Sequence, residues 1–334
     1  MRILALIAFG LAALNLLLVV FLVGRRLLLE RRDRRRQAAT ERVRPAVLAL
    51  IDGDTGAGEG LQRAEAEAFA ALLGRYAVSL RGESRNRITR WFEDHGAVAR
   101  ELGHLRDRRA WRRAQAAFTL GDMRSATAVP ALVAAFKDRS GDVRAAATRS
   151  LGRLRACEAI APAIDAAIDG LVPRSVVTAA ALELGPPVVP ALIPLLDHER
   201  PEVRSAAAEI YGLLEIGGDA EPLLELLQDP SPRVRAAAAL ALERIADASA
   251  AHALLETLDD ADDSVRAAAA VALGAIGGGQ IVDALLQVAR RDTFEPARAA
   301  AHSAARIAPG RVRAAADLPQ AGPFLAEAAD LAAL

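Results

Sequence analysis

The sequence has 334 residues, of which 53% are hydrophobic and only 4% aromatic. This aliphatic, alanine-rich composition favours helix over sheet. The single cysteine, Cys157, excludes a disulfide framework and a cysteine-based zinc site. The 42 basic and 42 acidic side chains cancel, so we do not expect the protein as a whole to attract nucleic acid.

The basic residues are almost all arginine, Lys137 being the exception. Together with the excess of alanine, this is typical of a GC-rich bacterial genome, so arginine content alone is weak evidence for phosphate binding. The charge is unevenly distributed. Residues 25–44 carry nine arginines against three acidic residues, and residues 45–334 have a net charge of −7.

The first residues predict a membrane anchor. Residues 3–23 form a run of 21 residues without a charge. As a helix this run would be about 31 Å long, which matches a bilayer core of roughly 30 Å. A cleaved signal peptide is the alternative. It would have a shorter apolar stretch, its positive charge in front and a small-residue cleavage site behind.

The flank that follows this run is far more positive than the one before it. The positive-inside rule therefore places the N-terminus outside and the remaining chain in the cytosol, in a single-pass protein of a bacterial inner membrane. The arginines of the flank either contact anionic lipid headgroups or act only as a topology signal. They are Arg25, Arg26, Arg31, Arg32, Arg34, Arg35 and Arg36.

From residue 105 onward the chain is self-similar. Seven segments follow a Val-Arg-Ala-Ala-Ala pattern, with a leucine eight residues after the first position and a glycine next to it in most of them. The first positions are Arg112, Val143, Val176, Val203, Val234, Val265 and Ala297. Each unit also has a second apolar segment, and proline and glycine mark the turns. The unit is therefore a pair of short helices, which must stack on its neighbours to bury its apolar faces.

These residues resemble HEAT repeats, in the short form called the PBS-lyase HEAT-like repeat, over about 105–307. The resemblance implies an all-α, right-handed solenoid of helix pairs. In that family aspartate and arginine form a ladder of ion pairs between neighbouring repeats. The candidates here are Asp107 and Arg113, Asp138 and Arg144, Asp197 and Arg204, Asp229 and Arg235, Asp260 and Arg266, and Asp292 and Arg298. The third unit has Val177 in place of arginine, so we expect a kink or a change of curvature there.

The predicted organisation has five parts. They are the anchor at 1–24, a basic juxtamembrane helix and linker at 25–60, a helical cap at 61–105, HEAT-like repeats at 106–307 and a C-terminal cap at 308–334. The glycine-rich end of the linker lacks the Gly-Lys-Ser/Thr ending of a phosphate loop. The aromatic residues between 69 and 136 either seal the first end of the solenoid or bind a partner there.

No motif in the sequence predicts catalysis, a metal or a cofactor. The five histidines lack metal-ligand spacing, and Cys157 has no paired histidine. The acidic residues at 259–263 precede a helix, where they would cap the N-terminus and oppose the dipole. We therefore do not expect an enzyme, although a site assembled across several repeats would leave no spacing pattern.

The inner face of the repeats is the predicted binding site. The sixth residue after each first position should point away from the core and line a groove for a helix or an extended peptide. These residues are Phe118, Arg149, Leu182, Glu209, Leu240 and Val271. The neighbouring small residues either widen this groove or only allow the helices to pack closely.

The whole chain also resembles bacterial membrane-tethered HEAT-repeat proteins, which implies a binding scaffold. The expected partner is a membrane protein or a recruited enzyme, such as a glycosyltransferase or a transporter. Two alternatives follow from other proteins with such repeats. Bilin lyases attach chromophores, but they are soluble and lack an anchor. Nucleic-acid-binding solenoids need a basic groove, which the charge of −7 over residues 45–334 disfavours.

Overall fold

The computed structural model describes residues 17–18, 21–23, 25–26, 34, 37–214 and 219–332. Most of the predicted anchor therefore lies outside the described residues, as do Arg31, Arg32, Arg35 and Arg36 of its basic flank. The described chain divides into two compact units. The first comprises residues 1–103 with 122–125, and the second comprises residues 104–121 with 126–334.

The first unit is a group of helices. It contains a helical segment at 37–52, α2 (Arg63–Ser79), α3 (Glu83–Asp94) and α4 (Ala97–His104). Its core is aromatic. Phe69 and Phe92 are fully buried, and the rings of Phe69 and Trp91 lie 5.0 Å apart. Since these aromatic side chains are buried, they stabilise the unit and are not a partner-binding surface, whereas Trp111 further along is 63% exposed.

The glycine-rich residues 53–60 form consecutive turns. Gly58 has a φ of +97°, and a Cβ atom at this position would lie 2.8 Å from the ring of Phe69. Ala57 beside it is buried. The sequence predicts a flexible turn or a linker here, and the structure shows turns that pack on the core of the first unit.

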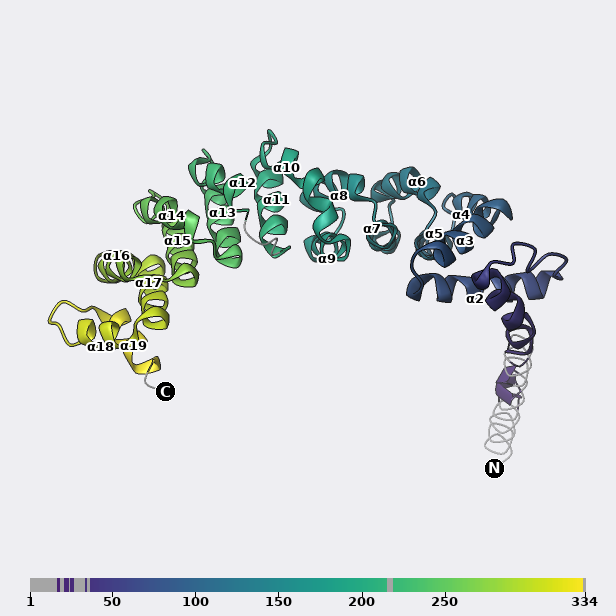
Figure 1. The fold of residues 1–334 in the computed structure, drawn as a ribbon, viewed down its shortest axis with the longest axis horizontal. Coiled ribbons are helices and arrows are strands. Elements are labelled where there is room, and N and C mark those ends of the chain that lie inside the picture. The colour runs from purple at the N-terminus through teal and green to yellow at the C-terminus, as the bar shows by residue number, and fades with distance from the viewer. Residues whose placement is uncertain are drawn as a thin grey trace, which may run out of the picture. The chain divides into compact units, whose positions relative to one another are not determined.

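The second unit confirms the predicted α-solenoid. Its repeats consist of one helix on an inner row and one on an outer row (Figure 1). The inner helices are α5 (Ala110–Met123), α7 (Gly141–Leu154), α9 (Arg174–Leu184), α11 (Pro201–Leu213), α13 (Pro232–Ile245), α15 (Asp263–Ile276) and α17 (Phe294–Ile307). The outer helices are α6 (Val129–Ala134), α8 (Ile160–Ile168), α10 (Val189–Leu196), α12 (Glu221–Leu224), α14 (Ala251–Thr257) and α16 (Gly279–Arg291). No strand occurs among the residues that the structure describes.

Short 3-10 turns flank many outer helices. They are η1 (Ala126–Ala128), η2 (Ala135–Lys137), η3 (Cys157–Ala159), η4 (Pro186–Val188), η5 (Glu225–Gln228) and η6 (Ala248–Ala250). Proline is the second residue of α6, α10 and α12, where its missing N–H has no helical partner to lose. The second unit ends with α18 (Pro309–Ala316) and α19 (Pro323–Leu331), and α19 packs on α17 and α18.

The residues that recur in the sequence repeats are the residues that the inner helices bury. In α13, Val234, Ala238 and Leu242 lie on one face and are completely buried. Residues four apart share a helix face, so these three positions form the stripe that faces the core. The third unit departs from this pattern, because in α9 the buried residue is Val177 and the preceding Val176 is partly exposed.

No helix among the described residues is, by itself, long and apolar enough to cross a bilayer. Residues 174–184 and 186–196 reach that length and composition only as a pair bent by 106°.

Candidate functional site

Neighbouring repeats are joined by arginine–aspartate pairs, each of which we call a rung. In a rung, the Nε and one Nη of an arginine on an inner helix donate to the two carboxylate oxygens of an aspartate in the next unit. Four rungs occur among the described residues, with N–O distances of 2.7–2.9 Å. They are Arg113–Asp138, Arg204–Asp229, Arg235–Asp260 and Arg266–Asp292.

The same arginine also contacts its own unit. Nη1 of Arg235 donates to the carbonyl of Asp229 at 2.9 Å, and Nη1 of Arg266 donates to the carbonyl of Asp260 at 2.7 Å. The aspartate carboxylate in turn accepts a backbone N–H in its own turn, as Asp229 does from Ser231 at 2.8 Å. Each rung therefore connects an inner helix, the turn before it and the turn of the following unit.

The ladder between neighbouring repeats is present, but the partners predicted from the sequence are wrong. Each rung aspartate binds the arginine 25 or 26 residues before it and not the one six residues after it. Of those following arginines, Arg144, Arg235 and Arg266 reach only the backbone carbonyl of the aspartate.

Four predicted members lie outside the rungs, and one of them, Asp107, forms an ion pair with Arg112 at 3.1 Å. Arg144 donates to the carbonyls of Leu171 and Asp138, whereas Asp197 and Arg298 are exposed and no described residue pairs with them.

The rungs shift the titration of their aspartates. The hydrogen bonds from Arg113, Arg235 and Arg266 hold the pKa of Asp138, Asp260 and Asp292 below the ordinary value, against the effect of burial. For Asp229, burial is the largest influence and raises the pKa. The hydrogen bonds from Arg204 and Ser231, with the charges of Arg204 and Arg235, outweigh it and leave the pKa lowered.

The glycine of the repeat lies where one inner helix meets the next. A Cβ atom at Gly212 of α11 would lie 2.6 Å from the Cα of Ala241 on α13, and one at Gly274 of α15 would lie 2.6 Å from the side chain of Ser303 on α17. Real Cβ atoms do not approach this closely, so glycine at these positions lets the helices pack tightly. The repeat glycine is thus a residue that allows the inner helices to pack closely. The small residues two positions after the start of each repeat, such as Ala145 and Ala236, are partly exposed on the inner helices.

Exposed apolar side chains alternate with charged ones along the inner row. Phe118, Leu182 and Leu240 are 44%, 47% and 43% exposed. Arg149 and Glu209, which come between them in the chain, are also exposed, and Val271 is partly exposed. The corresponding residue of α17, Ser303, is instead buried against Gly274.

Phe118 has a charged neighbour that the sequence analysis missed. The guanidinium of Arg153 on α7 lies over its ring at 4.3 Å, and Nη2 donates to the carbonyl of Phe118 at 3.1 Å. This cation–π contact holds the ring in place, and 44% of Phe118 stays exposed. The only signal in the sequence is the position of Arg153 directly after the repeat glycine, next to the neighbouring inner helix.

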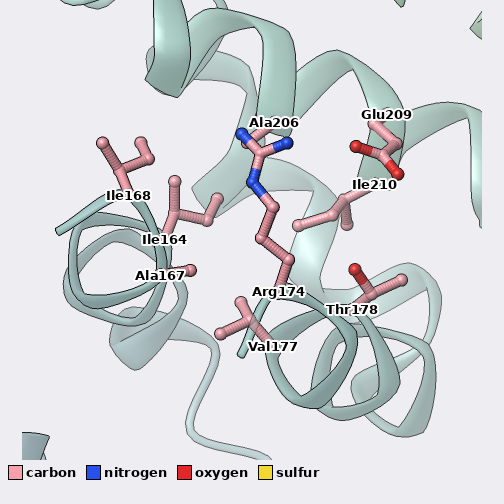
Figure 2. Close-up of a pocket in the computed structure, with 9 residues that line it drawn as sticks. All are labelled: Ile164, Ala167, Ile168, Arg174, Val177, Thr178, Ala206, Glu209 and Ile210. Carbon is pink, nitrogen blue, oxygen red and sulfur yellow. The ribbon is translucent and has the colours of Figure 1, made fainter. Parts of the chain in front are cut away.

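A small, partly open hollow of about 20 Å³ lies next to the irregular third unit (Figure 2). Three helices line it: α8, α9 and α11. The lining residues are Ile164, Ala167, Ile168, Arg174, Val177, Thr178, Ala206, Glu209 and Ile210. Arg174 extends through the middle of this space, between the isoleucines of α8 and Ile210 of α11. Of these residues the sequence analysis singled out only Glu209 for binding.

Several other polar groups have structural roles. His95 stacks on Trp91 with ring centres 4.3 Å apart, and Nδ1 of His198 accepts the backbone N–H of Arg200. Asp262 caps α15 by accepting the N–H of Ser264, as predicted for the acidic cluster. Burial raises the pKa of the Cys157 thiol, which makes it less reactive. Among the described residues no group of three or more His, Cys, Asp or Glu side chains is placed to hold a metal ion.

Comparison with known proteins identifies the repeat. A family profile described as HEAT repeats matches residues 99–183 and 220–306, which together are more than half of the chain. No curated protein sequence matches. The gap between the two matched stretches, residues 184–219, begins at the last residue of α9 and contains α10 and α11.

Solved structures match the chain at low identity and low TM-score. The X-ray structure of YibA from E. coli is 19% identical, covering 75% of this chain and 98% of that chain with a TM-score of 0.38. The complex of CpcE and CpcF of phycocyanin lyase from Nostoc sp. PCC7120 is 22% identical over 70% of this chain and 94% of that one, with a TM-score of 0.32. A designed armadillo repeat protein is 20% identical over 63% and 99%, with a TM-score of 0.31.

Proposed function

The chain belongs to the HEAT-repeat family, and on that premise we propose that it is a scaffold that binds another protein along the inner row of its repeats. HEAT-type solenoids present extended concave surfaces for binding. The observation that carries the proposal is the series of exposed apolar side chains on inner helices, namely Phe118, Leu182 and Leu240. Exposure of these apolar side chains to water is unfavourable, and their burial against a partner would stabilise the complex.

The alternation of apolar and charged residues favours an elongated protein partner. Inner helices of such a stack lie 8–10 Å apart in general, so Phe118 and Leu182, two helices apart, would be separated by roughly 20 Å. A helix of a partner rises about 1.5 Å per residue and spans that distance in about 13 residues. Arg149 and Glu209 are then available for polar contacts between the apolar anchors.

We further propose that the scaffold is held at a bacterial inner membrane with its repeats in the cytosol. The support is the uncharged run at 3–23 and the arginines that follow it. A tethered scaffold meets membrane proteins and membrane-associated enzymes most often. The partner we expect is therefore of this class, for example a glycosyltransferase or a transporter.

The test is a pull-down of the full-length protein from its own membranes in mild detergent, with mass spectrometry of the proteins that copurify. We expect one stoichiometric partner that is lost when Phe118, Leu182 and Leu240 are all replaced by glutamate. The matched control replaces Ile193 of α10 and Leu318 after α18, which are 40% and 44% exposed, by glutamate. A partner that is retained by the triple variant, or lost equally in the control, would contradict the proposal.

A further inference from the structure

The first inner helix of the second unit, α5, has an exposed aromatic stripe. Trp111 and Phe118 are 63% and 44% exposed, and Gln115 between them is exposed as well. Residues four and seven apart share one face of a helix, so these three side chains lie on one face of α5. The seven-residue interval separates the two aromatic residues by about 10 Å along the helix axis. We call these three residues the α5 stripe.

Guanidinium groups accompany both rings of the α5 stripe. Arg112 lies 5.4 Å from the ring centre of Trp111. Arg153 of α7 lies over the ring of Phe118, and the exposed Arg149 precedes Arg153 by one helical turn. The stripe therefore combines apolar area with positive charge from two neighbouring inner helices.

The charge of the repeats that carry the stripe differs from that of the later ones. Residues 105–160 contain twelve basic and five acidic side chains, a net charge of +7. Two of the five acids, Asp107 and Asp138, form ion pairs with arginine, whereas Asp142 of α7 is exposed. Residues 161–334 contain 13 basic and 25 acidic side chains, a net charge of −12. The second unit is thus positive at its first two repeats and negative beyond them.

The residues beside the rungs show the same difference at equivalent backbone positions. In the first rung, which joins α5 to the turn before α7, the aspartate lies between Lys137 and Arg139, and both are exposed. At the rung aspartates Asp229, Asp260 and Asp292, at most one of the two neighbouring residues is basic. The positive charge at the first repeats is therefore not a requirement of the rung.

We propose that the α5 stripe binds a short acidic segment of a partner protein. Apolar side chains of the segment would cover the rings of Trp111 and Phe118, and its carboxylates would lie beside Arg112 and Arg149. The acidic repeats at 161–334 would repel the same segment, so it is confined to the first two repeats. The inference rests on the scaffold function proposed above, and it adds the chemistry of the partner and its direction along the inner row.

A nucleic acid or a membrane surface fits these observations less well. Each is an extended array of phosphates. It would also meet the later repeats, where residues 161–334 have a net charge of −12. A segment of a few residues can instead lie on α5 and α7 alone.

The test begins with full-length protein in mild detergent and a displayed library of short random peptides as the probe. We expect enrichment of peptides that have a net negative charge and contain aromatic or aliphatic side chains. The absence of enrichment, or enrichment of neutral or basic peptides, would overturn the inference.

The affinity of the enriched peptides is then measured by fluorescence anisotropy. Trp111→Ala should weaken binding about five- to thirtyfold, the usual effect of removing an aromatic anchor. Arg149→Glu should weaken it at least tenfold, because like charges then face each other, and added salt should reduce the binding of the wild type. Since both side chains are exposed, neither change should lower the melting temperature.

The matched controls lie on α17. Phe294→Ala removes a ring that is 62% exposed, and Arg298→Glu reverses the charge of an exposed arginine. Both variants should bind the peptides as the wild type does. Equal losses in the α17 variants would show a general effect of charge or apolar area and would overturn the inference.

Competition distinguishes a protein segment from other anions. A single-stranded oligonucleotide, or mixed micelles that contain phosphatidylglycerol, should not displace the peptide when added at an equal concentration of negative charge. Displacement by either would make the α5 stripe a general anion site and would contradict the assignment to an acidic protein segment.

The pull-down of the membrane partner separates this inference from the scaffold function. It compares the double variant Trp111→Ala with Arg149→Glu and the double variant Leu182→Glu with Leu240→Glu. If only the second variant loses the partner, the scaffold is supported and the α5 stripe is not its docking site. If only the first loses it, the stripe is supported and the wider inner row is not the binding site. Loss in both supports both proposals, and loss in neither overturns both.

Discussion

Arg235 of α13 holds both carboxylate oxygens of Asp260, 25 residues further along the chain, at 2.7 and 2.8 Å, and at the same time reaches the carbonyl of Asp229 behind it. One side chain thus connects three successive turns of the solenoid. Both members of the pair are largely buried, with 15% and 11% of their side chains exposed. A pair in this position is screened less by water than a surface ion pair.

Replacing Arg235 by Gln should destabilise the repeats. The change leaves Asp260 without its charged partner and lowers the free energy of unfolding by about 1.5–3 kcal/mol. This corresponds to a fall in melting temperature of about 3–12 °C, measured by circular dichroism. Arg298→Gln is the matched control, because Arg298 is exposed and has no described partner, and its melting temperature should stay that of the wild type.

The rungs should also make the stability of the fold depend on pH. The folded-state pKa of Asp260 is lowered by Arg235, so the rung stabilises the fold fully above the unfolded-state value near pH 4. As pH falls through the lowered pKa, this contribution is lost. The melting temperatures of the wild type and Asp260→Asn should therefore differ at pH 7 and converge below about pH 4. A difference that stays constant down to acid pH would mean that the charge of Asp260 contributes nothing.

The repeat glycine should not tolerate even a methyl group. In Gly212→Ala the new Cβ would meet the backbone of Ala241 at 2.6 Å, forcing α11 and α13 apart. We expect a loss of about 1–3 kcal/mol in urea denaturation, the usual cost of overpacking. Gly74 of α2 offers the control, since nothing lies within 4 Å of a Cβ there. Gly74→Ala should raise stability by about 0.5–1 kcal/mol through higher helix propensity.

The predicted anchor can be tested by fractionation of cells. Deleting residues 1–36 should move the protein from the membrane pellet to the soluble fraction. Replacing Leu17 and Leu18 by arginine in the full chain should act in the same direction, because both lie within the uncharged run at 3–23 and a charged residue inside a span is unfavourable, by about 2.5–3.5 kcal/mol at its centre. Continued pelleting of the deletion variant would point to a tightly bound membrane partner or a second lipid-binding surface.

A third variant addresses the arginines that follow the anchor. Replacing Arg31, Arg32, Arg34, Arg35 and Arg36 by glutamine distinguishes their two predicted roles. If they bind headgroups, purified protein should bind vesicles rich in anionic lipid more weakly, by about 1 kcal/mol per arginine in contact with the surface. If they act only as a topology signal, vesicle binding should be unchanged and protease protection in spheroplasts should change instead.

The sequence by itself determined the repeating unit. The valine, alanine and leucine positions recur at helical spacing, and their burial depends only on which face of a single helix they occupy. This local rule places Val234, Ala238 and Leu242 in the core and Phe118, Leu182 and Leu240 outside it. The acidic cap of α15 at Asp262 is equally local, because it involves an N–H two residues away.

The tertiary structure alone decided how the units meet. Arg235 has Asp229 six residues before it and Asp260 25 residues after it, and the sequence does not say which carboxylate turns toward it. The choice follows from the stacking of one helix pair on the next, which also requires the glycine at 212. The hollow around Arg174 is likewise a tertiary feature, because its lining residues come from three helices, α8, α9 and α11.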